Sequence, residues 1–578
     1  MDPIKLIISL LELLAGVGIF IVGMNMMGDG LEKGAGHGLK GLFNKISNNR
    51  FAGIGIGTAV TAIIQSSSAT SVMVIGFVNA GVMTLFQAAS IILGANIGTT
   101  VTGLIVALQS LGQNGAEVAK TSISFSDIAI VLAFVGVMMM FAKKKEKIKL
   151  AGTILCGLGV IFVGLDIMSG SLKGNEINEF FSNKVFAPIA DLGIAPILFI
   201  IVGAIFTAII QSSSAATGIV IIMAGSGVID VQDALFIVLG SNIGTCVTAL
   251  LACIGTGTNA KRTTFIHFFN KIAGVVVFTP FIWIFREPIV NFLESATGGN
   301  IQFQIALFHV IFNVTNAFIL APFISHIVKL AEMAIKEKKT TVDEFKPKFI
   351  DERILITPAI AYEQAKKEIG YMANLAKENI VASLAEINEP TKEMPPVIYG
   401  KENDINLTNK ALTDFLIKLS SEVNAEYEKH VGAFFHVIND LERIGDHAKN
   451  FLEISEELIE KGLELSKSAK DEVAYMASKV TRMFTLAIEI FEETDEINTK
   501  SPEVTSRLTE LSAIETETDK LKKEYISNHF TRLAAGECIA SHSPYYMSIV
   551  TRLERVADHL VNVGYSIVNP TGSQSQID

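Results

Sequence analysis

Long apolar stretches occupy most of residues 6–330, and this feature restricts the possible folds more than any other. The stretches are rich in Gly, Ala, Ile and Val, and charged residues are confined to a few short loops. Because a bilayer core offers the backbone no hydrogen-bonding partner, such a chain crosses it as helices of about 20 residues. The first stretch has no basic segment or small-residue cleavage site before Asp29, so we expect it to remain as a transmembrane helix.

Beyond Lys336 the sequence becomes rich in Glu and Lys and poor in Gly, which is typical of soluble helices. Lys and Arg gather in short loops at residues 143–149 and 261–262 and at the exit near residues 336–339. Cytoplasmic loops carry the basic excess, so the pattern predicts a cell inner (cytoplasmic) membrane protein with a cytoplasmic C-terminal half. The net charge of −11 argues against nucleic-acid binding, and the oligomeric state stays open.

Three short patterns recur in the same order along the apolar half. The matching segments are residues 18–27 and 159–168, residues 61–69 and 207–215, and residues 94–99 and 240–245. Ordered recurrence is the signature of an internal repeat. We therefore predict two membrane transport repeats, at residues 1–142 and 150–330, followed by a linker at 331–354.

The second pattern contains Gln-Ser-Ser-Ser, at Gln65–Ser68 and again at Gln211–Ser214. The apolar arms beside it are too short to cross a bilayer, so each motif is predicted to be the tip of a re-entrant hairpin. One crossing at residues 6–28, one helix broken at the Asn96 motif and one crossing at 127–142 make an odd number, which inverts the second copy. The predicted fold class is all-α: a polytopic membrane protein with two inverted repeats, each with a re-entrant hairpin and a broken helix, before a soluble helical-bundle domain.

The polar residues of these patterns suit a binding site for an anion and a cation. Adjacent hydroxyls and amides supply donors and acceptors, a restarting helix adds free N–H groups for an anion, and carbonyl and hydroxyl oxygens suit Na⁺. Small residues and serines also serve close helix packing, as in Gly94-x-x-x-Gly98, but ordered duplication favours a site. The candidate binding residues are Gln65, Ser66, Ser67, Ser68, Asn96, Thr99, Gln211, Ser212, Ser213, Ser214, Asn242 and Thr245.

The paired Gln-Ser-Ser-Ser motifs, each followed by Gly-x-Asn-Ile-Gly-Thr, resemble the type II sodium/phosphate cotransporter family over most of residues 1–330. The resemblance implies import of inorganic phosphate coupled to sodium ions by alternating access, with the candidate residues lining the substrate and sodium sites. Electrogenic animal members carry an aspartate after an Ala-Gly pair, where this chain has Ala35-Gly36-His37. Sodium stoichiometry and electrogenicity therefore stay open.

Other polar residues lie within the apolar segments. Two segments resemble late helices of that family: one runs from His267 to Asn270 and the other from His309 to Asn313. Asp166 matches Asn25 by repeat position. Interhelical hydrogen bonding and a direct role in transport are both open for them.

The C-terminal half contains a second duplication, at residues 441–450 and 553–562. In a helix, Glu442 lies one turn from Asp446, and Glu554 one turn from Asp558, so each pair could hold a divalent or ferric metal ion. Acidic faces neutralised by neighbouring arginines are the alternative. The segment resembles PhoU-like domains, which implies two three-helix bundles at residues 355–568 that bind metal and regulate phosphate uptake.

Three functions compete at this stage. The first is a sodium-coupled phosphate importer with a PhoU-like regulatory domain. The second is a phosphate-binding membrane receptor or regulator, or a phosphate exporter. The third, a membrane-anchored metal-dependent enzyme, lacks an identifiable nucleophile or base, so we expect no enzymatic activity.

Overall fold

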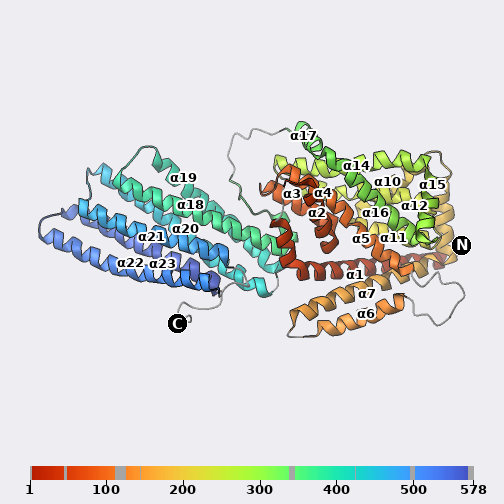
Figure 1. The fold of residues 1–578 in the computed structure, drawn as a ribbon, viewed down its shortest axis with the longest axis horizontal. Helices are drawn as coiled ribbons and strands as arrows, with labels where there is room; N and C mark the ends of the chain where they lie inside the picture. Colours follow the sequence, from red (N-terminus) through yellow and green to blue (C-terminus); the bar gives the residue numbers. More distant parts are fainter. Residues whose placement is uncertain are drawn as a thin grey trace. The chain divides into compact units, whose positions relative to one another are not determined.

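The computed structural model describes residues 3–44, 48–110, 125–142, 145–336, 345–423, 425–494 and 501–569. Throughout these ranges the regular structure is helical and no strand occurs, which confirms the predicted all-helical class. The chain forms two compact units, Met1–Lys339 and Thr340–Asp578 (Figure 1). Lys143, Lys144, Lys338 and Lys339, and the side chain of His37, lie outside the described part of the chain.

Six helices of the first unit are long and apolar enough to cross a membrane, as predicted for a polytopic protein. They span Pro3–Ala35, Leu85–Ser110, Lys147–Leu172, Val231–Ala252, Thr258–Ile284 and Ile301–Ala334. The corresponding elements are α1 (Pro3–Asn44), α4 and α5 (Leu85–Gly98, Thr100–Ala107), α7 (Glu146–Leu172), α12 and α13 (Val231–Gly244, Cys246–Ala252), α14 (Thr258–Ile284), and α16 and α17 (Ile301–Leu320, Ile324–Ala334).

Two pairs of shorter apolar helices form the predicted hairpins. In the first copy α2 (Arg50–Ile64) ends at Gln65, and α3 (Ser67–Asn79) begins two residues later. In the second copy α10 (Ala195–Ile210) and α11 (Ser213–Gly225) are arranged in the same way around Gln211. These four helices have 15, 13, 16 and 13 residues, fewer than the about 20 residues that a membrane span needs.

Glycines allow the first arm of each hairpin to pack directly on the helix that follows the hairpin. A Cβ atom on Gly94 of α4 would lie 1.9 Å from the carbonyl oxygen of Ile54 in α2. A Cβ atom on Gly240 of α12 would lie 1.9 Å from the carbonyl oxygen of Ile200 in α10. The small-residue pattern therefore serves helix packing in both copies, with the same partners in each.

The first helices of the two copies, α1 and α7, pack against each other in opposite directions. Gly16 of α1 contacts Met168, Gly23 contacts Ile161 and Gly30 contacts Ile154, so α7 is traversed backwards along α1. Glycine at every seventh position of α1 lets the two backbones approach closely. Helix α6 (Phe125–Met140) packs on the other side of α7 (Figure 1).

The broken helices are interrupted less than the sequence suggested. Helix α4 gives way to α5 at Thr99, and α12 gives way to α13 at Thr245, and both threonines keep right-handed helical dihedral angles. Each interruption is therefore a single residue within a nearly continuous helix.

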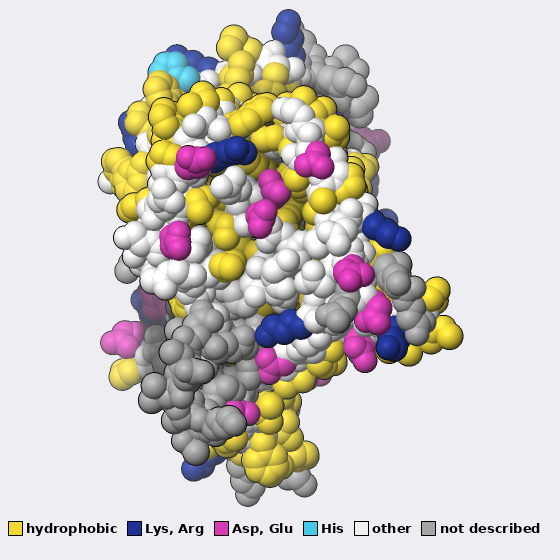
Figure 2. Space-filling model, turned by 90° about the vertical axis from the view of Figure 1, so that its right-hand side faces the viewer, with side chains coloured by type: hydrophobic (Ala, Val, Ile, Leu, Met, Phe, Trp, Pro, Cys, Tyr) yellow, Lys and Arg dark blue, Asp and Glu magenta, His cyan; other side chains and the backbone are white. Residues whose placement is uncertain are grey.

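The remaining helices of this unit are α8 (Asn175–Glu179), a π-helical segment at Phe180–Phe186, α9 (Ala187–Ala190) and α15 (Arg286–Thr297). Large hydrophobic side chains such as Ile209, Val276 and Ile284 are exposed, as expected of a surface that faces lipid. Figure 2 shows the end of the unit near α15 and the N-terminus, where charged side chains dot the end face and hydrophobic side chains gather around it.

The described part of the second unit contains six long helices, which run lengthwise side by side (Figure 1). One group of three comprises α18 (Pro358–Asn388), α19 (Met394–Glu422) and α20 (Ala425–Glu460), and the other comprises α21 (Lys467–Glu493), α22 (Pro502–Ala534) and α23 (Ser543–Val568). The two groups meet where α20 packs on α23 and α18 packs on α21. Each of the two duplicated acidic motifs lies on one of the central helices, α20 or α23.

Candidate functional site

Both Gln-Ser-Ser-Ser motifs line one cavity of about 390 Å³ in the first unit. Every residue of Gln65–Ser68 and Gln211–Ser214 contributes to the lining, although the two motifs lie far apart in the sequence. The volume falls in the range of about 300–1,000 Å³ that is usual for small-ligand sites. The two repeats thus build one site together.

The first serine of each motif caps a helix. The hydroxyl oxygen of Ser66 accepts a hydrogen bond from the N–H of Ala69 (3.1 Å), and that of Ser212 accepts one from the N–H of Ala215 (3.2 Å). These two hydroxyls therefore fix the starts of α3 and α11. Their contribution to the cavity is structural as well as polar.

The next two serines of each motif begin the helices and face the cavity. Ser67, Ser213 and Ser214 are buried, and Ser68 accepts a hydrogen bond from the hydroxyl of Thr248 (3.2 Å) in the other copy. The first N–H groups of a helix have no acceptor within the helix, and they carry partial positive charge. The cavity therefore receives the N-terminal ends of two 13-residue helices together with several hydroxyls, a combination that favours an anion.

The two motif glutamines share a strained backbone but differ in their side-chain partners. Gln65 and Gln211 are the non-glycine residues with positive φ among the described residues, at 57° and 59°. The Gln65 amide donates to the carbonyl oxygen of Ala62 and accepts from the hydroxyl of Thr102 (2.9 Å). Gln211 is exposed, and no hydrogen bond joins its side chain to the described residues. Strain of this kind gathers at functional sites.

Helix α1 supplies a third wall of the cavity, which the sequence reasoning did not anticipate. Asn25, Asp29 and Glu32 line it, together with Ile21, Met24 and Gly28 on the same helical face. One Glu32 carboxylate oxygen is buried without a hydrogen-bond partner. The spacing of three and four residues was a visible signal of one shared face. Carboxylate oxygens beside the hydroxyls give the cavity ligands for a cation as well as for an anion.

The Asn-Ile-Gly-Thr segments lie within the helix pack and do not line this cavity. The hydroxyl of Thr99 donates to the carbonyl oxygen of Ala95, and that of Thr245 donates to the carbonyl oxygen of Asn242, so both threonines bond within their own helices. Asn96 and Asn242 are buried. A role for these four residues in ion binding stays a prediction.

The other polar membrane residues make hydrogen bonds with nearby groups, within one helix or between helices. His267 bonds to the hydroxyl of Ser71 (3.2 Å), and the Asn313 amide donates to the carbonyl oxygen of His309. Asp166 accepts from the Gln109 amide (2.8 Å). These contacts give each of the three residues an interhelical or local hydrogen-bonding role.

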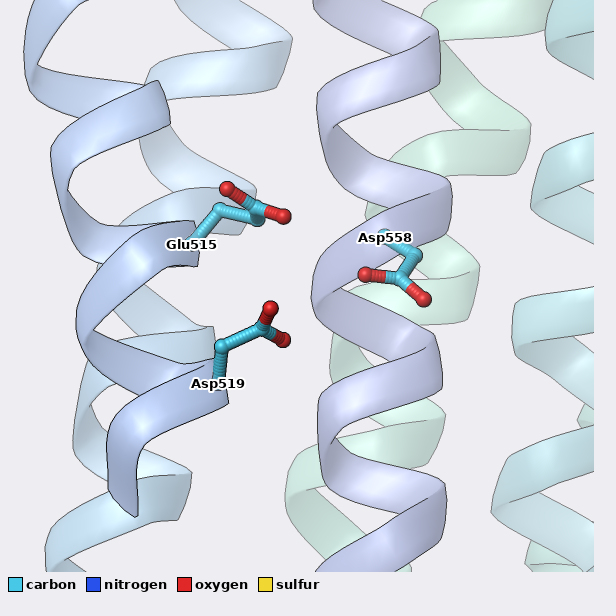
Figure 3. A group of neighbouring side chains, drawn as sticks. All are labelled: Glu515, Asp519 and Asp558. Carbon is cyan, nitrogen blue, oxygen red and sulfur yellow. The ribbon is translucent and has the colours of Figure 1, made fainter. Parts of the chain in front are cut away.

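In the second unit a group of three carboxylates includes one of the predicted metal ligands. Asp558 of α23 faces Glu515 and Asp519 of α22 (Figure 3), and one carboxylate oxygen of each residue lies within 4.8 Å of the other two. Burial, with Glu554, Asp519 and Glu515 nearby, raises the pKa of Asp558 to about 6. Three converging carboxylates fit a hard divalent or ferric ion.

The other three predicted ligands are arranged differently. Glu554 pairs with Lys522 (2.9 Å) and not with Asp558. In the first copy burial, followed by the nearby Asp446, raises the pKa of Glu442, but the described residues offer no third carboxylate ligand that completes a group there. Between the two copies, His559 bonds to Asp440 (2.7 Å), and its ring lies 5.9 Å from that of His447. Among the described residues, a group of carboxylates that could hold a metal ion is thus found in the second bundle, and the metal itself stays a prediction.

Sequence comparison relates both units to known families. The model of the Na⁺/Pi-cotransporter family matches residues 19–170 and again residues 172–309. The PhoU domain model matches residues 369–455 and 473–567. Each family model matches twice, in agreement with the two duplications.

Curated relatives share this similarity over different fractions of their length. YqeW of Bacillus subtilis, an uncharacterized protein, is 31% identical over 322 residues, which are 55% of this chain and 96% of YqeW. YjbB of Salmonella typhimurium, whose name proposes inorganic phosphate export, is 25% identical over 442 residues, 76% of each protein. Sodium-dependent phosphate transport protein 2A of Rattus norvegicus is 24% identical over 378 residues, 45% of this chain and 59% of the relative. No solved structure matches the chain.

Proposed function

The chain belongs to the Na⁺/Pi-cotransporter family, a family of phosphate transporters and not of enzymes, and we propose that it imports inorganic phosphate together with Na⁺ by alternating access. Its membrane unit performs the transport. The PhoU domain at residues 369–455 and 473–567 regulates it from the cytoplasm.

One observation carries this proposal: both serine motifs and the α1 carboxylates line a single cavity. Phosphate oxygens accept hydrogen bonds from the hydroxyls and from the N–H groups at the starts of α3 and α11. Asp29 and Glu32 bring negative charge beside that anion, which is unfavourable unless a cation is bound with them. Sodium is the cation that neutralises them, so anion and cation bind in mutual dependence.

The antiparallel contact of α1 and α7 supports inversion of the second copy relative to the first. Inverted copies that share a central site allow one half to rock against the other and expose the site to each side in turn. The cavity lining extends along α1 from Ile21 to Glu32, toward the end that carries Lys33.

The direction of transport follows from the coupling. An inward Na⁺ gradient drives phosphate inward when both ions bind together, whereas export with Na⁺ would work against the gradient. Similarity to YjbB, over 76% of each protein, makes export without Na⁺ coupling the second candidate. The two functions therefore differ in their response to sodium.

Uptake of labelled phosphate into proteoliposomes separates these functions. Purified full-length protein is tested with an inward Na⁺ gradient, with an equal inward K⁺ gradient, and with Na⁺ on both sides. Import coupled to sodium predicts accumulation with the inward Na⁺ gradient alone. Equal uptake in all three conditions would contradict sodium coupling. Equal uptake together with rapid efflux from phosphate-loaded vesicles would favour the exporter.

The carboxylate group of the PhoU domain is a second site with its own role. Glu515, Asp519 and Asp558 would hold a divalent or ferric ion between α22 and α23. Such an ion would neutralise carboxylates that repel one another and would join the two helices. A metal-dependent change in the stiffness of this bundle is a route by which the domain regulates transport.

A further inference from the structure

Lys271 is a buried lysine in the middle of α14, a span long enough to cross a membrane, and its side chain is 3% exposed. Its ammonium group donates a hydrogen bond to the side-chain oxygen of Asn242 (3.1 Å). No carboxylate forms an ion pair with it within the described ranges. The ionisable groups that interact with its charge are Cys246, His267 and His309. A buried cation without a counter-charge is costly, and intramembrane charges of this kind serve function.

Helix α14 belongs to the second copy and contacts helices of both copies. It packs on α3 and α4 of the first copy and on α12 and α13 of the second. Lys271 therefore places a positive charge among the helices that carry the serine motif of one copy and the Asn-Ile-Gly-Thr motif of the other.

The two motif asparagines differ in the hydrogen-bond partner of their side-chain oxygen. Asn96 in α4 and Asn242 in α12 occupy equivalent repeat positions and are 3% and 4% exposed. The side-chain oxygen of Asn242 accepts from the Lys271 ammonium, whereas that of Asn96 is buried and has no hydrogen-bond partner. A buried acceptor left without a donor is destabilising unless a ligand supplies positive charge.

We propose that the Lys271 ammonium is a tethered cation that fills, in the second copy, the position at which Asn96 of the first copy binds a diffusible Na⁺. This inference rests on the proposed sodium coupling. Side-chain amide oxygens are suitable ligands for a hard cation such as Na⁺, and the lysine ammonium is a compact positive charge on a flexible stem that can take the place of such an ion. The transporter then moves one Na⁺ fewer than its internal symmetry would allow.

A purely structural role for the lysine explains less. A neutral side chain such as glutamine could donate the same hydrogen bond without burying a charge, and methionine could fill the same volume. The positive charge is the property that neither replacement supplies. A positively charged partner is also what the Asn96 side-chain oxygen lacks.

The test counts sodium ions bound to purified full-length protein, by equilibrium binding of labelled Na⁺ in detergent. Asn96→Leu removes the side-chain oxygen that has no hydrogen-bond partner, and this variant is expected to bind one Na⁺ fewer than the wild type. Asn242→Leu is its matched control in the second copy and is expected to keep the wild-type count, although its transport falls. Lys271→Ser vacates the tethered position, leaves an oxygen there and is expected to gain one ion. Lys271→Met fills the space and is expected to gain none.

The outcomes separate this inference from the proposed function. A wild-type protein that binds no Na⁺ would overturn sodium coupling itself. A wild type that binds Na⁺, with an unchanged count in Lys271→Ser, would overturn the tethered cation alone. If the Lys271 variants do not fold, the comparison of Asn96→Leu with Asn242→Leu decides, because equal losses in both contradict the proposal.

Discussion

At the scale of single residues, the serine motifs divide their work between holding the hairpin tip and lining the cavity. Gln65 and Gln211 turn the chain through left-handed backbone angles, Ser66 and Ser212 cap the next helices, and the remaining serines face the cavity. The left-handed conformation costs about 1–2 kcal/mol for a side chain of this kind. An amide at the cavity is retained in spite of that cost.

This division predicts different effects for adjacent serines. Ser66→Ala loses the cap to the Ala69 N–H and should lower stability by about 1 kcal/mol. Ser67→Ala, one residue later, should leave thermal stability nearly unchanged and weaken phosphate binding. Thermal unfolding of the purified protein with and without phosphate measures both effects. Equal destabilisation by the two substitutions would contradict the assignment of Ser66 as the cap.

The acidic group at α22 and α23 predicts a pH-dependent metal affinity. Because burial, with the neighbouring carboxylates, raises the pKa of Asp558 to about 6, protons compete with the metal as pH falls through that value. Without metal, the pKa of Asp558 is higher in the folded state than in the unfolded state, so protonation of Asp558 favours the folded form. The stability of the metal-free protein should therefore rise as the pH falls through about 6 toward the unfolded-state pKa.

A matched pair of variants checks that site. Asp558→Asn should lower metal affinity at pH 7 by at least about 10-fold, whereas Glu554→Gln should change it much less, because Glu554 pairs with Lys522. Titration of the full-length protein with Mn²⁺ gives both affinities. A larger loss from Glu554→Gln would return the site to the pair predicted from the sequence.

At the scale of elements, close helix packing decides how the hairpins are held. Both Gly55 and Gly57 lie in α2, but a Cβ on Gly57 would lie 2.0 Å from the carbonyl oxygen of Ile91, whereas a Cβ on Gly55 meets nothing within 4 Å. The position of Gly55 therefore tolerates a side chain, whereas the position of Gly57 does not.

Alanine substitution at these two glycines tests the packing directly. Gly57→Ala forces α2 away from α4 and should cost about 1–3 kcal/mol, with loss of transport because the hairpin tip moves. Gly55→Ala should be neutral or stabilising by up to about 1 kcal/mol. Thermal stability and phosphate uptake of the two variants are compared side by side, and similar behaviour of both would argue against this contact.

Much of this arrangement was predictable from local sequence. The short arms beside Gln65 and Gln211 indicated hairpins, and duplication indicated that both tips matter. The wall formed by Asp29 and Glu32 was not predicted, because their helical spacing shows that they share a face but not what that face contacts. Likewise, Glu554 and Asp558 share a helix, but their partners lie on α22. Glu554 pairs with Lys522, and Asp558 faces Glu515 and Asp519. Contacts between helices decide these cases, and a single sequence does not contain them.

At the scale of the whole molecule, two units with distinct chemistry are joined in one chain. The membrane unit, Met1–Lys339, contains the shared cavity, and the unit Thr340–Asp578 contains the carboxylate group. Because the two serine motifs meet in one cavity, the membrane unit should bind phosphate once and not once per repeat. The proposed transport depends on this single shared site.

Calorimetric titration of phosphate into the purified full-length protein, with and without Na⁺, tests that claim most directly. We predict one phosphate per chain, bound in the presence of Na⁺, and a weakened affinity at that same site in both Ser67→Ala and Ser213→Ala. Two independent phosphate sites, each lost in only one of these variants, would contradict it.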